Sequence, residues 1–213
     1  MSKYPIFLDF SGRRVVVIGA GLVAARKAQS LLATGARLVV VGKNVDDLPP
    51  FPTRANVELV KSRYSRDYLM GASIVIAATN NDRINRQIYR DCQELEILCN
   101  VVDEPELCDF FIPAVVKRGD LQIAIGTDGK SPAYAGHLRK KLEEQFTELH
   151  GDFLAELEVI RKTILETIAD SGDRKSLLGS LVKDESFEHF VKNGAEAWRK
   201  RTQKIIEDFC LPD

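Results

Sequence analysis

The sequence predicts an α/β fold with a doubly wound parallel sheet, followed by a connecting segment and a helical C-terminal domain. The stretch Val15-Val16-Val17-Ile18 is too continuously apolar for a half-exposed strand, which indicates burial on both faces. Apolar strands then alternate with helical patterns as far as about residue 102. From Gly151 onward the apolar residues recur at helical spacing. We therefore expect three parts, at residues 1–113, 114–150 and 151–213.

The elements of the first part follow in order from their residue patterns. Strands are expected at the short apolar runs of residues 15–18, 38–41, 57–60, 74–78 and 97–102. One helix is expected from Leu22 to Thr34, with Gly35 as its stop signal, and another from about Asp82 to Leu95. This alternation is typical of a parallel sheet covered by helices.

The pattern changes after Pro113. Apolar residues alternate with polar or small ones at residues 121–125, which predicts a strand with two unequal faces. Ser131 followed by Pro132 has the features of a helix start, and we expect that helix to run to about Leu149. The later helices should share an apolar core and be interrupted at residues 171–173.

Composition limits the possible functions. The chain has 213 residues, 30 basic against 31 acidic side chains and a formal charge of -1, so it has no overall field for nucleic acid or an anionic membrane. No run approaches the ~18 apolar residues of a membrane span. The four cysteines form no C-x-x-C pair and the three histidines do not cluster with them, which favours reduced thiols in a cytoplasmic protein and no metal site.

A glycine turn follows the first strand. Gly19-Ala20-Gly21-Leu22-Val23-Ala24 matches G-x-G-x-x-[G/A] between a buried strand and a helix, the Rossmann-type context for a dinucleotide pyrophosphate. Gly19 permits the tight turn, Gly21 lets the backbone approach the phosphates, and Ala24 lets the helix lie on the sheet. The helix N-terminus would face the phosphates with unpaired N–H groups. The alternative is a glycine turn that binds nothing.

The preference between NAD and NADP stays open. An acidic residue for the ribose hydroxyl is usual about 20 residues after such a turn, but that place holds Val41-Gly42-Lys43-Asn44. Asn44 or Asp46 would suit the hydroxyl of NAD, whereas Lys43 would favour the 2′-phosphate of NADP.

Two loops should meet the cofactor at the carboxyl edge of the sheet. Asp103 follows the strand that ends at Val102, and Thr79-Asn80-Asn81-Asp82 follows the strand 74–78. Both are expected to face the nicotinamide. Partial burial of Asp103 would raise its pKa toward that of a useful base. The alternative is an ordinary turn residue before Glu104-Pro105.

The sequence resembles the precorrin-2 dehydrogenase family of sirohaem biosynthesis. Some members of that family are also ferrochelatases, and others are fused to a methyltransferase. The resemblance depends on motifs in the family's order between residues 5 and about 143: Pro5-Ile6-Phe7, Val17 to Gly21 with Val23-Ala24 and Arg26-Lys27, Ala77 to Asp82 with Asn85, Cys99 to Asp103, Phe110 to Ala114, and Gly129 to Pro132.

The resemblance implies an NAD-dependent dehydrogenase that converts precorrin-2 to sirohydrochlorin. Its essential aspartate falls on Asp103. Its NAD-contacting positions fall on Gly21, Leu22, Val23, Thr79 and Asn100. It also implies a stand-alone homodimer whose connecting segment crosses between subunits.

The resemblance also places the substrate near the connecting segment. Ser131 lies near the active site and is phosphorylated in at least one relative. The macrocycle carries eight carboxylates, so we expect Lys130, His137 and Arg139 to contact it, with Phe111 nearby. Relatives often have arginine where this chain has Gly136, which puts one carboxylate contact in doubt. The alternative for these cations is a solvated helix face.

The sequence leaves two further functions open. Asp103 would also serve to strip pyrrole protons in metal insertion, so ferrochelatase activity is a separate hypothesis. A regulatory module that binds NAD without redox chemistry is the hypothesis from another class, although it has no need for the motifs at residues 100–103 and 110–113.

Overall fold

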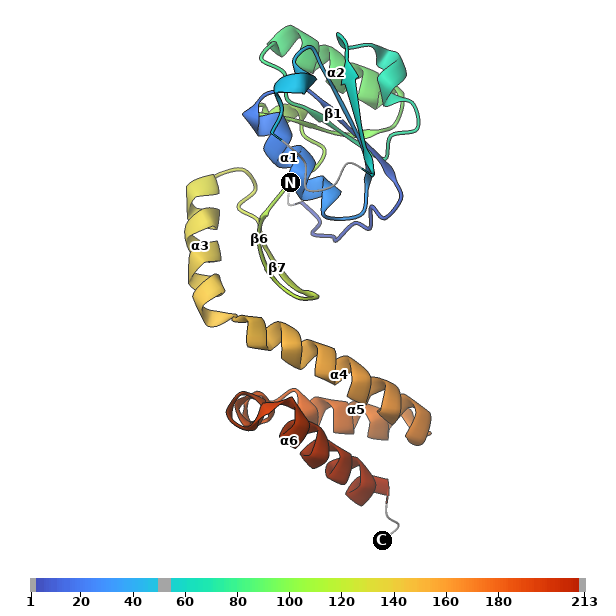
Figure 1. Ribbon diagram of the computed structural model, residues 1–213, viewed down its shortest axis with the longest axis vertical. Helices are drawn as coiled ribbons and strands as arrows, with labels where there is room; N and C mark the ends of the chain where they lie inside the picture. The colour runs from blue at the N-terminus through green and yellow to red at the C-terminus, as the bar shows by residue number, and fades with distance from the viewer. Residues whose placement is uncertain (1–2, 50–54, 211–213) are drawn as a thin grey trace. The chain divides into compact units, whose positions relative to one another are not determined.

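The computed structural model describes residues 3–49 and 55–210. The chain divides between Ile112 and Pro113 into two compact units (Figure 1). Each unit has its own apolar core. The finer division into three parts stays a prediction.

The first unit contains a five-stranded sheet in which every strand is parallel to its neighbours. Its strand order is β3-β2-β1-β4-β5. The strands are β1 (Arg14–Ile18), β2 (Arg37–Gly42), β3 (Val57–Lys61), β4 (Ile74–Ala77) and β5 (Leu98–Val101). The chain winds to one side of β1 for β2 and β3, and to the other side for β4 and β5. The predicted doubly wound, Rossmann-type fold is therefore confirmed.

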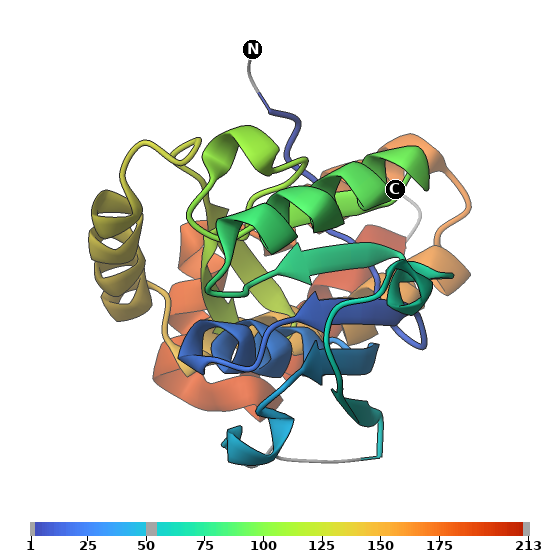
Figure 2. The same cartoon turned by 90° about the horizontal axis from the view of Figure 1, so that it is seen from above.

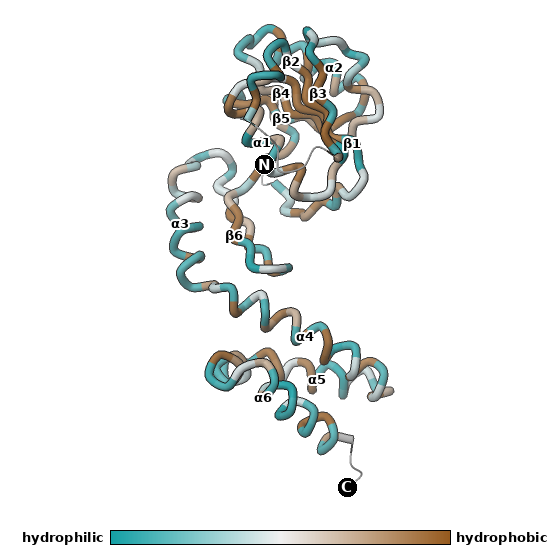
Figure 3. Tube along the Cα trace, viewed as in Figure 1, coloured by the Kyte–Doolittle hydropathy of each residue, from teal (hydrophilic) through white to brown (hydrophobic). Residues whose placement is uncertain are grey.

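Helices α1 (Leu22–Leu32) and α2 (Asp82–Glu94) cover opposite faces of this sheet (Figure 2). Alternate residues of β1 serve the two faces, because Val15 and Val17 join the core that contains residues of α1, while Val16 joins the core that contains residues of α2. The strands are brown in the hydropathy colouring of Figure 3. Each such side chain stabilises the fold by about 1.5–3 kcal/mol relative to exposure to water.

The second unit begins with an antiparallel hairpin of β6 (Ala114–Arg118) and β7 (Leu121–Ile125). The helices that follow are α3 (Pro132–Gln145), α4 (Glu148–Thr167), α5 (Ser171–Leu181) and α6 (Asp184–Cys210). The backbone of α6 leaves the helical region at Gly194 (φ 82°, ψ 168°), where the helix kinks. The expected helical core is present as one buried cluster that includes Phe153, Ile160, Ile164, Ile168, Phe190 and Trp198.

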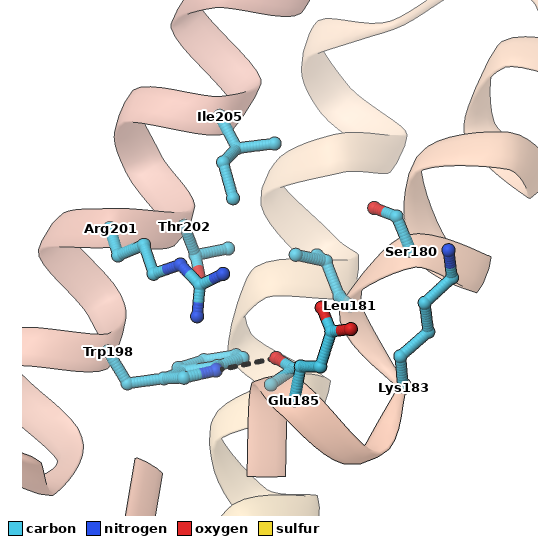
Figure 4. Close-up of a pocket in the computed structure, with 9 residues that line it drawn as sticks. Ser180, Leu181, Lys183, Glu185, Trp198, Arg201, Thr202 and Ile205 are labelled. Atoms are coloured by element: carbon cyan, nitrogen blue, oxygen red, sulfur yellow. Dashed lines mark hydrogen bonds between the residues drawn. The ribbon is translucent and has the colours of Figure 1, made fainter. Parts of the chain in front are cut away.

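A small hollow lies between α5 and α6. It measures about 40 Å³ and is lined by residues that include Lys183, Ser186, Trp198 and Arg201 (Figure 4). The Trp198 indole N–H donates a hydrogen bond of 2.9 Å to the Ser186 hydroxyl. A space of this size suits one or two water molecules, so we assign the hollow no ligand.

Two expectations about the second unit need correction, and one of its strands was missed. The helix expected to reach about Leu149 ends at Gln145, because the Thr147 N–H donates to His150 Nδ1 at 3.1 Å and a new helix begins there. The strand β6 was not predicted. Residues 171–173 open α5 and do not interrupt a helix, since Asp170 Oδ1 accepts from the N–H of Asp173 at 2.9 Å.

Within the described ranges, no helix has both the length and the apolar composition that crossing a bilayer demands.

Candidate functional site

The glycine turn lies where β1 leaves the sheet between β2 and β4. The N–H of Gly19 donates to the carbonyl of Val41 at 2.8 Å, and the N–H of Ala78 donates to the carbonyl of Ile18 at 2.7 Å. Gly19 has φ +133°, and a Cβ at this position would lie 2.2 Å from the carbonyl oxygen of Ala78. Only glycine fits both the dihedral angle and the space. The turn therefore sits where the winding of the sheet reverses, the usual place for a ligand in such sheets.

The N-terminus of α1 is open toward the same edge. Gly21 is the N-cap residue in extended conformation, and no side chain of the described residues caps the helix there. A Cβ added to Gly21 would meet no described atom within 4 Å. Leu22 is 84% exposed, whereas Ala24 is fully buried against the sheet. The first N–H groups of α1 and its dipole therefore face open space that suits an anion.

The exit of β2 holds no acid beside the turn. A Cβ on Gly42 would lie 2.7 Å from the Cβ of Ala20, so the close approach of the turn leaves no room for a carboxylate side chain there. Lys43 follows and is exposed. Asp46 forms an ion pair of 2.5 Å with Lys61, whose strand position is opposite Gly42. The charged groups at this exit thus include two lysines and a paired aspartate.

The loop after β4 is fastened by Asn85 of α2. The Thr79 hydroxyl donates to Asn85 Oδ1 at 2.6 Å, and Asn85 Nδ2 donates to the carbonyl of Thr79 at 3.0 Å. Asn81 Oδ1 accepts from the N–H of Ile84 at 3.0 Å and so caps α2. Asn80 is exposed between them. Asn85 is a functional candidate that the sequence reasoning did not assign.

The exit of β5 carries Asn100 and Asp103. Asn100 is buried, and its Nδ2 donates to the carbonyl of Phe110 at 2.9 Å. Asp103 lies two residues beyond the strand with φ +64°, a left-handed conformation that aspartate adopts more readily than most residues. Its side chain is exposed, so the expected partial burial is wrong.

Lys27 of α1 is the second candidate that the sequence reasoning did not assign. Its side chain is half-buried. Burial lowers the pKa of its ammonium, the nearby Arg26 lowers it further, and the negative charge of Asp103 opposes the shift. Lys27 therefore contributes a positive charge within electrostatic reach of Asp103.

Most of the predicted substrate residues lie on or next to α3 in the second unit. The Ser131 hydroxyl accepts from the N–H of Tyr134 at 3.2 Å, so the predicted N-cap is present. Lys130 and His137 are exposed, and His137 stacks with Tyr134 at a centroid distance of 6.3 Å. Arg139 is ion-paired with Glu143 one turn along the helix.

Phe111 belongs to the first unit. The Lys3 ammonium lies 4.3 Å from the centroid of its ring, within the range of a cation–π contact. Among the residues that the structure describes, no group of three or more histidine, cysteine or acidic side chains is placed to hold a metal ion.

A family model described as putative NAD(P)-binding matches residues 6–114, just over half of the chain. The chain belongs to this putative NAD(P)-binding family. A second model, described as sirohaem biosynthesis protein central, matches residues 118–145. These two matches confirm the resemblance to sirohaem-biosynthesis proteins.

Curated relatives of the family are much longer than this chain. A siroheme synthase of Psychrobacter arcticus is 36% identical over 152 residues, which cover 71% of this chain and 28% of the relative. A siroheme synthase of Citrobacter koseri is 31% identical over 212 residues, which cover 98% of this chain and 46% of the relative. The chain thus spans less than half of the length of either relative.

A solved structure extends the comparison to the fold. The protein named "SirC, precorrin-2 dehydrogenase" matches with a TM-score of 0.75 and 23% identity, and the match covers 95% of this chain and 100% of that one. The shared fold includes both the parallel sheet and the helical C-terminal part.

The structure brings one group of predicted residues together within the first unit. The glycine turn, the Thr79–Asp82 loop and the Asn100–Asp103 exit all follow the carboxyl ends of β1, β4 and β5, which are neighbours in the sheet. Lys43 follows β2 at the same edge. Chemically, this edge offers an anion site, fixed amide and hydroxyl groups, and the exposed carboxylate of Asp103.

Proposed function

We propose that this chain oxidises precorrin-2 to sirohydrochlorin with NAD as the hydride acceptor. The observation that supports it is that the glycine turn at residues 19–21 follows β1 and Asp103 follows β5, the second strand from β1, at the same edge of one sheet. The names of the curated relatives and of the protein with the matching fold point to the same chemistry.

The residues present fit a dinucleotide. The open backbone at Gly21 and the uncapped N-terminus of α1 would hold the pyrophosphate, with Gly19, Leu22 and Val23 shaping the turn. Ala24 keeps the helix close to the sheet. NAD, when bound, supplies the acceptor for a hydride. Thr79, Asn80 and Asn81 would orient the nicotinamide, and Asn100 would complete this part of the cofactor site.

Asp103 would act as the general base. Two hydrogens must leave the macrocycle, one as a hydride and one as a proton, so a carboxylate beside the nicotinamide has a direct role. Its exposure lets it pass the proton on to water. Lys27 would add a positive charge near Asp103.

The substrate carboxylates would bind cations of the second unit. Lys130 and His137 are exposed and available, and Arg139 would exchange its Glu143 partner for a substrate carboxylate. Ser131 and Phe111 complete the proposed substrate contacts. If these cations are only a solvated face, their replacement by neutral residues would leave KM for precorrin-2 unchanged.

We further propose a homodimer. Within the described residues the sheet of β6 and β7 has two strands, and although α3 and α4 pack against it, Val116 is the one residue of these strands that is fully buried. Exposed apolar side chains on this unit, such as Val115 and Tyr134, suit a subunit contact. Light scattering coupled to gel filtration tests this, and a monomer at micromolar concentration would contradict it.

The decisive experiment for the main proposal follows the absorbance of precorrin-2 with NAD under anaerobic conditions, for the natural chain and for Asp103→Asn. We expect conversion to sirohydrochlorin by the natural chain, and a loss of about 100-fold or more in turnover with unchanged NADH binding for the variant. Full activity of Asp103→Asn would reject its role. NADH binding without any absorbance change in the natural chain would favour the regulatory module instead.

Metal insertion is a second activity that the exposed carboxylate of Asp103 suits, since pyrrole protons must be removed when a metal enters sirohydrochlorin. Anaerobic incubation of sirohydrochlorin with Fe²⁺ or Co²⁺ and no NAD measures it. A rate equal to the uncatalysed rate would remove this activity from the proposal.

A further inference from the structure

The thiol of Cys108 lies against the loop that carries Asp103. Its sulfur is 3.2 Å from the carbonyl oxygen of Val101 and 3.3 Å from the carbonyl oxygen of Glu104. These two carbonyls flank Asp103, one before it and one after it. The single thiol hydrogen is therefore shared between the two ends of the loop.

Cys108 is itself held in place by β5. Asn100 Nδ2 donates to the Cys108 sulfur at 3.3 Å, and the backbones of these two residues form an antiparallel bridge. Asn100 is only 6% exposed, so its position is fixed by packing. The next residue, Asp109, adds two contacts to the same strand: its N–H donates to the carbonyl of Cys99 at 2.8 Å, and its Oδ2 accepts from the N–H of Cys99 at 2.8 Å.

The loop needs such a restraint because of Asp103. A left-handed residue other than glycine is strained, and it persists only where its surroundings determine it. The side chain of Asp103 is exposed and so is not oriented by packing. The direction of its carboxylate is therefore set by the backbone between Val101 and Glu104.

A second restraint acts on Glu104, at the end of the loop. Arg86 of α2 forms an ion pair of 2.6 Å with Glu104. The ion pair fixes the side chain of Glu104, whereas Cys108 contacts the backbone itself. Burial raises the pKa of the Cys108 thiol, which keeps the hydrogen on the sulfur.

We propose that Cys108 is a positioning residue for Asp103, acting through the carbonyls of Val101 and Glu104. The inference rests on the proposed function, in which Asp103 accepts a proton from the substrate. Loss of the thiol donor would let the loop leave its left-handed conformation. The carboxylate would then be misplaced, whereas Asn100 of the cofactor site would keep its hydrogen bond to the carbonyl of Phe110.

The test compares Cys108→Ala with Cys108→Ser. Serine keeps a donor toward the same two carbonyls, whereas alanine removes it. We expect kcat for precorrin-2 oxidation to fall about tenfold in Cys108→Ala, with KM for NAD and the Kd of NADH within about twofold of the natural values. Cys108→Ser should keep kcat within about threefold of the natural chain.

Two controls separate positioning from general stability. Cys99→Ala removes a fully buried thiol from the neighbouring strand position and should lower the melting temperature without lowering kcat. In the Asp103→Asn background, Cys108→Ala should cause no further loss of turnover, because the two changes act through the same group. The proposal would be overturned if Cys108→Ala lowered turnover as much in the Asp103→Asn background as in the natural chain. It would also be overturned if Cys99→Ala lowered kcat as much as Cys108→Ala, or if Cys108→Ala had the kcat of the natural chain.

Amide hydrogen exchange of the peptide that spans residues 102–107 provides a readout without turnover. Exchange should be faster in Cys108→Ala and natural in Cys108→Ser. A natural chain that fails to oxidise precorrin-2 would defeat the proposed function. Unchanged exchange in Cys108→Ala would instead defeat the positioning role of Cys108.

Discussion

Thr79 and Asn85 hold each other across the start of α2. The hydroxyl and the N–H of Thr79 both donate to Asn85 Oδ1, at 2.6 and 3.2 Å, and Asn85 Nδ2 returns a bond of 3.0 Å to the carbonyl of Thr79. Asn85 is 4% exposed, so this exchange is shielded from water. The loop proposed to orient the nicotinamide is therefore rigid before any cofactor binds.

Replacing Asn85 by alanine should loosen this loop. The change leaves polar groups of Thr79 unpaired at a partly buried place, which costs about 1–3 kcal/mol of unfolding free energy. We expect the Kd of NADH, measured by fluorescence titration, to rise about tenfold. Arg83→Ala, an exposed position on the same helix, is the matched control and should change neither quantity. Natural NADH affinity in Asn85→Ala would show that the loop does not contact the cofactor.

The two glycines of the turn should respond differently to alanine. At Gly19 a Cβ meets the Ala78 carbonyl at 2.2 Å and φ is +133°, so Gly19→Ala should lose about 3 kcal/mol of stability. At Gly21 a Cβ has open space, and the backbone is extended. Gly21→Ala should therefore fold normally but bind NADH more weakly than the natural chain, because the methyl group occupies the place of the pyrophosphate. Thermal unfolding and NADH titration of both variants check this contrast, and strong NADH binding by Gly21→Ala would contradict it.

Asp46 should influence the preference between NADH and NADPH. It neutralises Lys61, and Lys43 stands at the same strand exit. Asp46→Asn frees the Lys61 charge, so the affinity for NADPH relative to NADH should rise about fivefold. Asp47→Asn removes an equal charge from the next residue and serves as the control. An unchanged ratio of the two Kd values in Asp46→Asn would place the ribose elsewhere.

The parallel sheet and its two covering helices could be predicted because their residue patterns are strong. The run Val15 to Ile18 has no polar residue to suggest a solvent face, and all four side chains are at most 2% exposed. The hairpin strand at residues 114–118 gave no such signal. It contains two valines beside lysine and arginine, and only Val116 is fully buried. The break at Thr147 was missed because histidine replaces the usual Glu or Gln of a capping box.

The candidate site divides in the same way. Its location was predictable, since the ends of parallel strands bring Gly19, Thr79 and Asp103 to one edge whatever the loops do. The restraints within it were not predictable. The bonds of Asn85 to Thr79, and of Cys108 to the loop of Asp103, depend on backbone geometry that no spacing encodes. The expected burial of Asp103 was wrong for the same reason, because the left-handed turn directs it to solvent.

The helical unit should lose stability in acid through Glu156. The guanidinium of Arg199 donates two hydrogen bonds of 2.5 Å to this carboxylate and thereby joins α6 to α4. The bonds from Arg199 lower the pKa of Glu156 below its usual range, although its burial opposes the shift. A carboxylate with a lower pKa in the folded chain stabilises the fold above its unfolded pKa, and this stabilisation is lost as the pH falls through the folded value.

Fluorescence of Trp198, the single tryptophan, reports unfolding of this unit because the side chain lies in its core. Between pH 7 and pH 3, the unfolding free energy of Glu156→Gln should fall by about 1 kcal/mol less than that of the natural chain. Glu158→Gln is the matched control, because Glu158 pairs with Lys162 on the same helix but is exposed. Its stability should follow the natural pH profile. If Glu156→Gln and the natural chain lost stability in parallel as the pH falls, the ion pair between Arg199 and Glu156 would not link α4 and α6 in solution. The packing of Trp198 against Phe153 and Phe190 would then be what holds α6 in place.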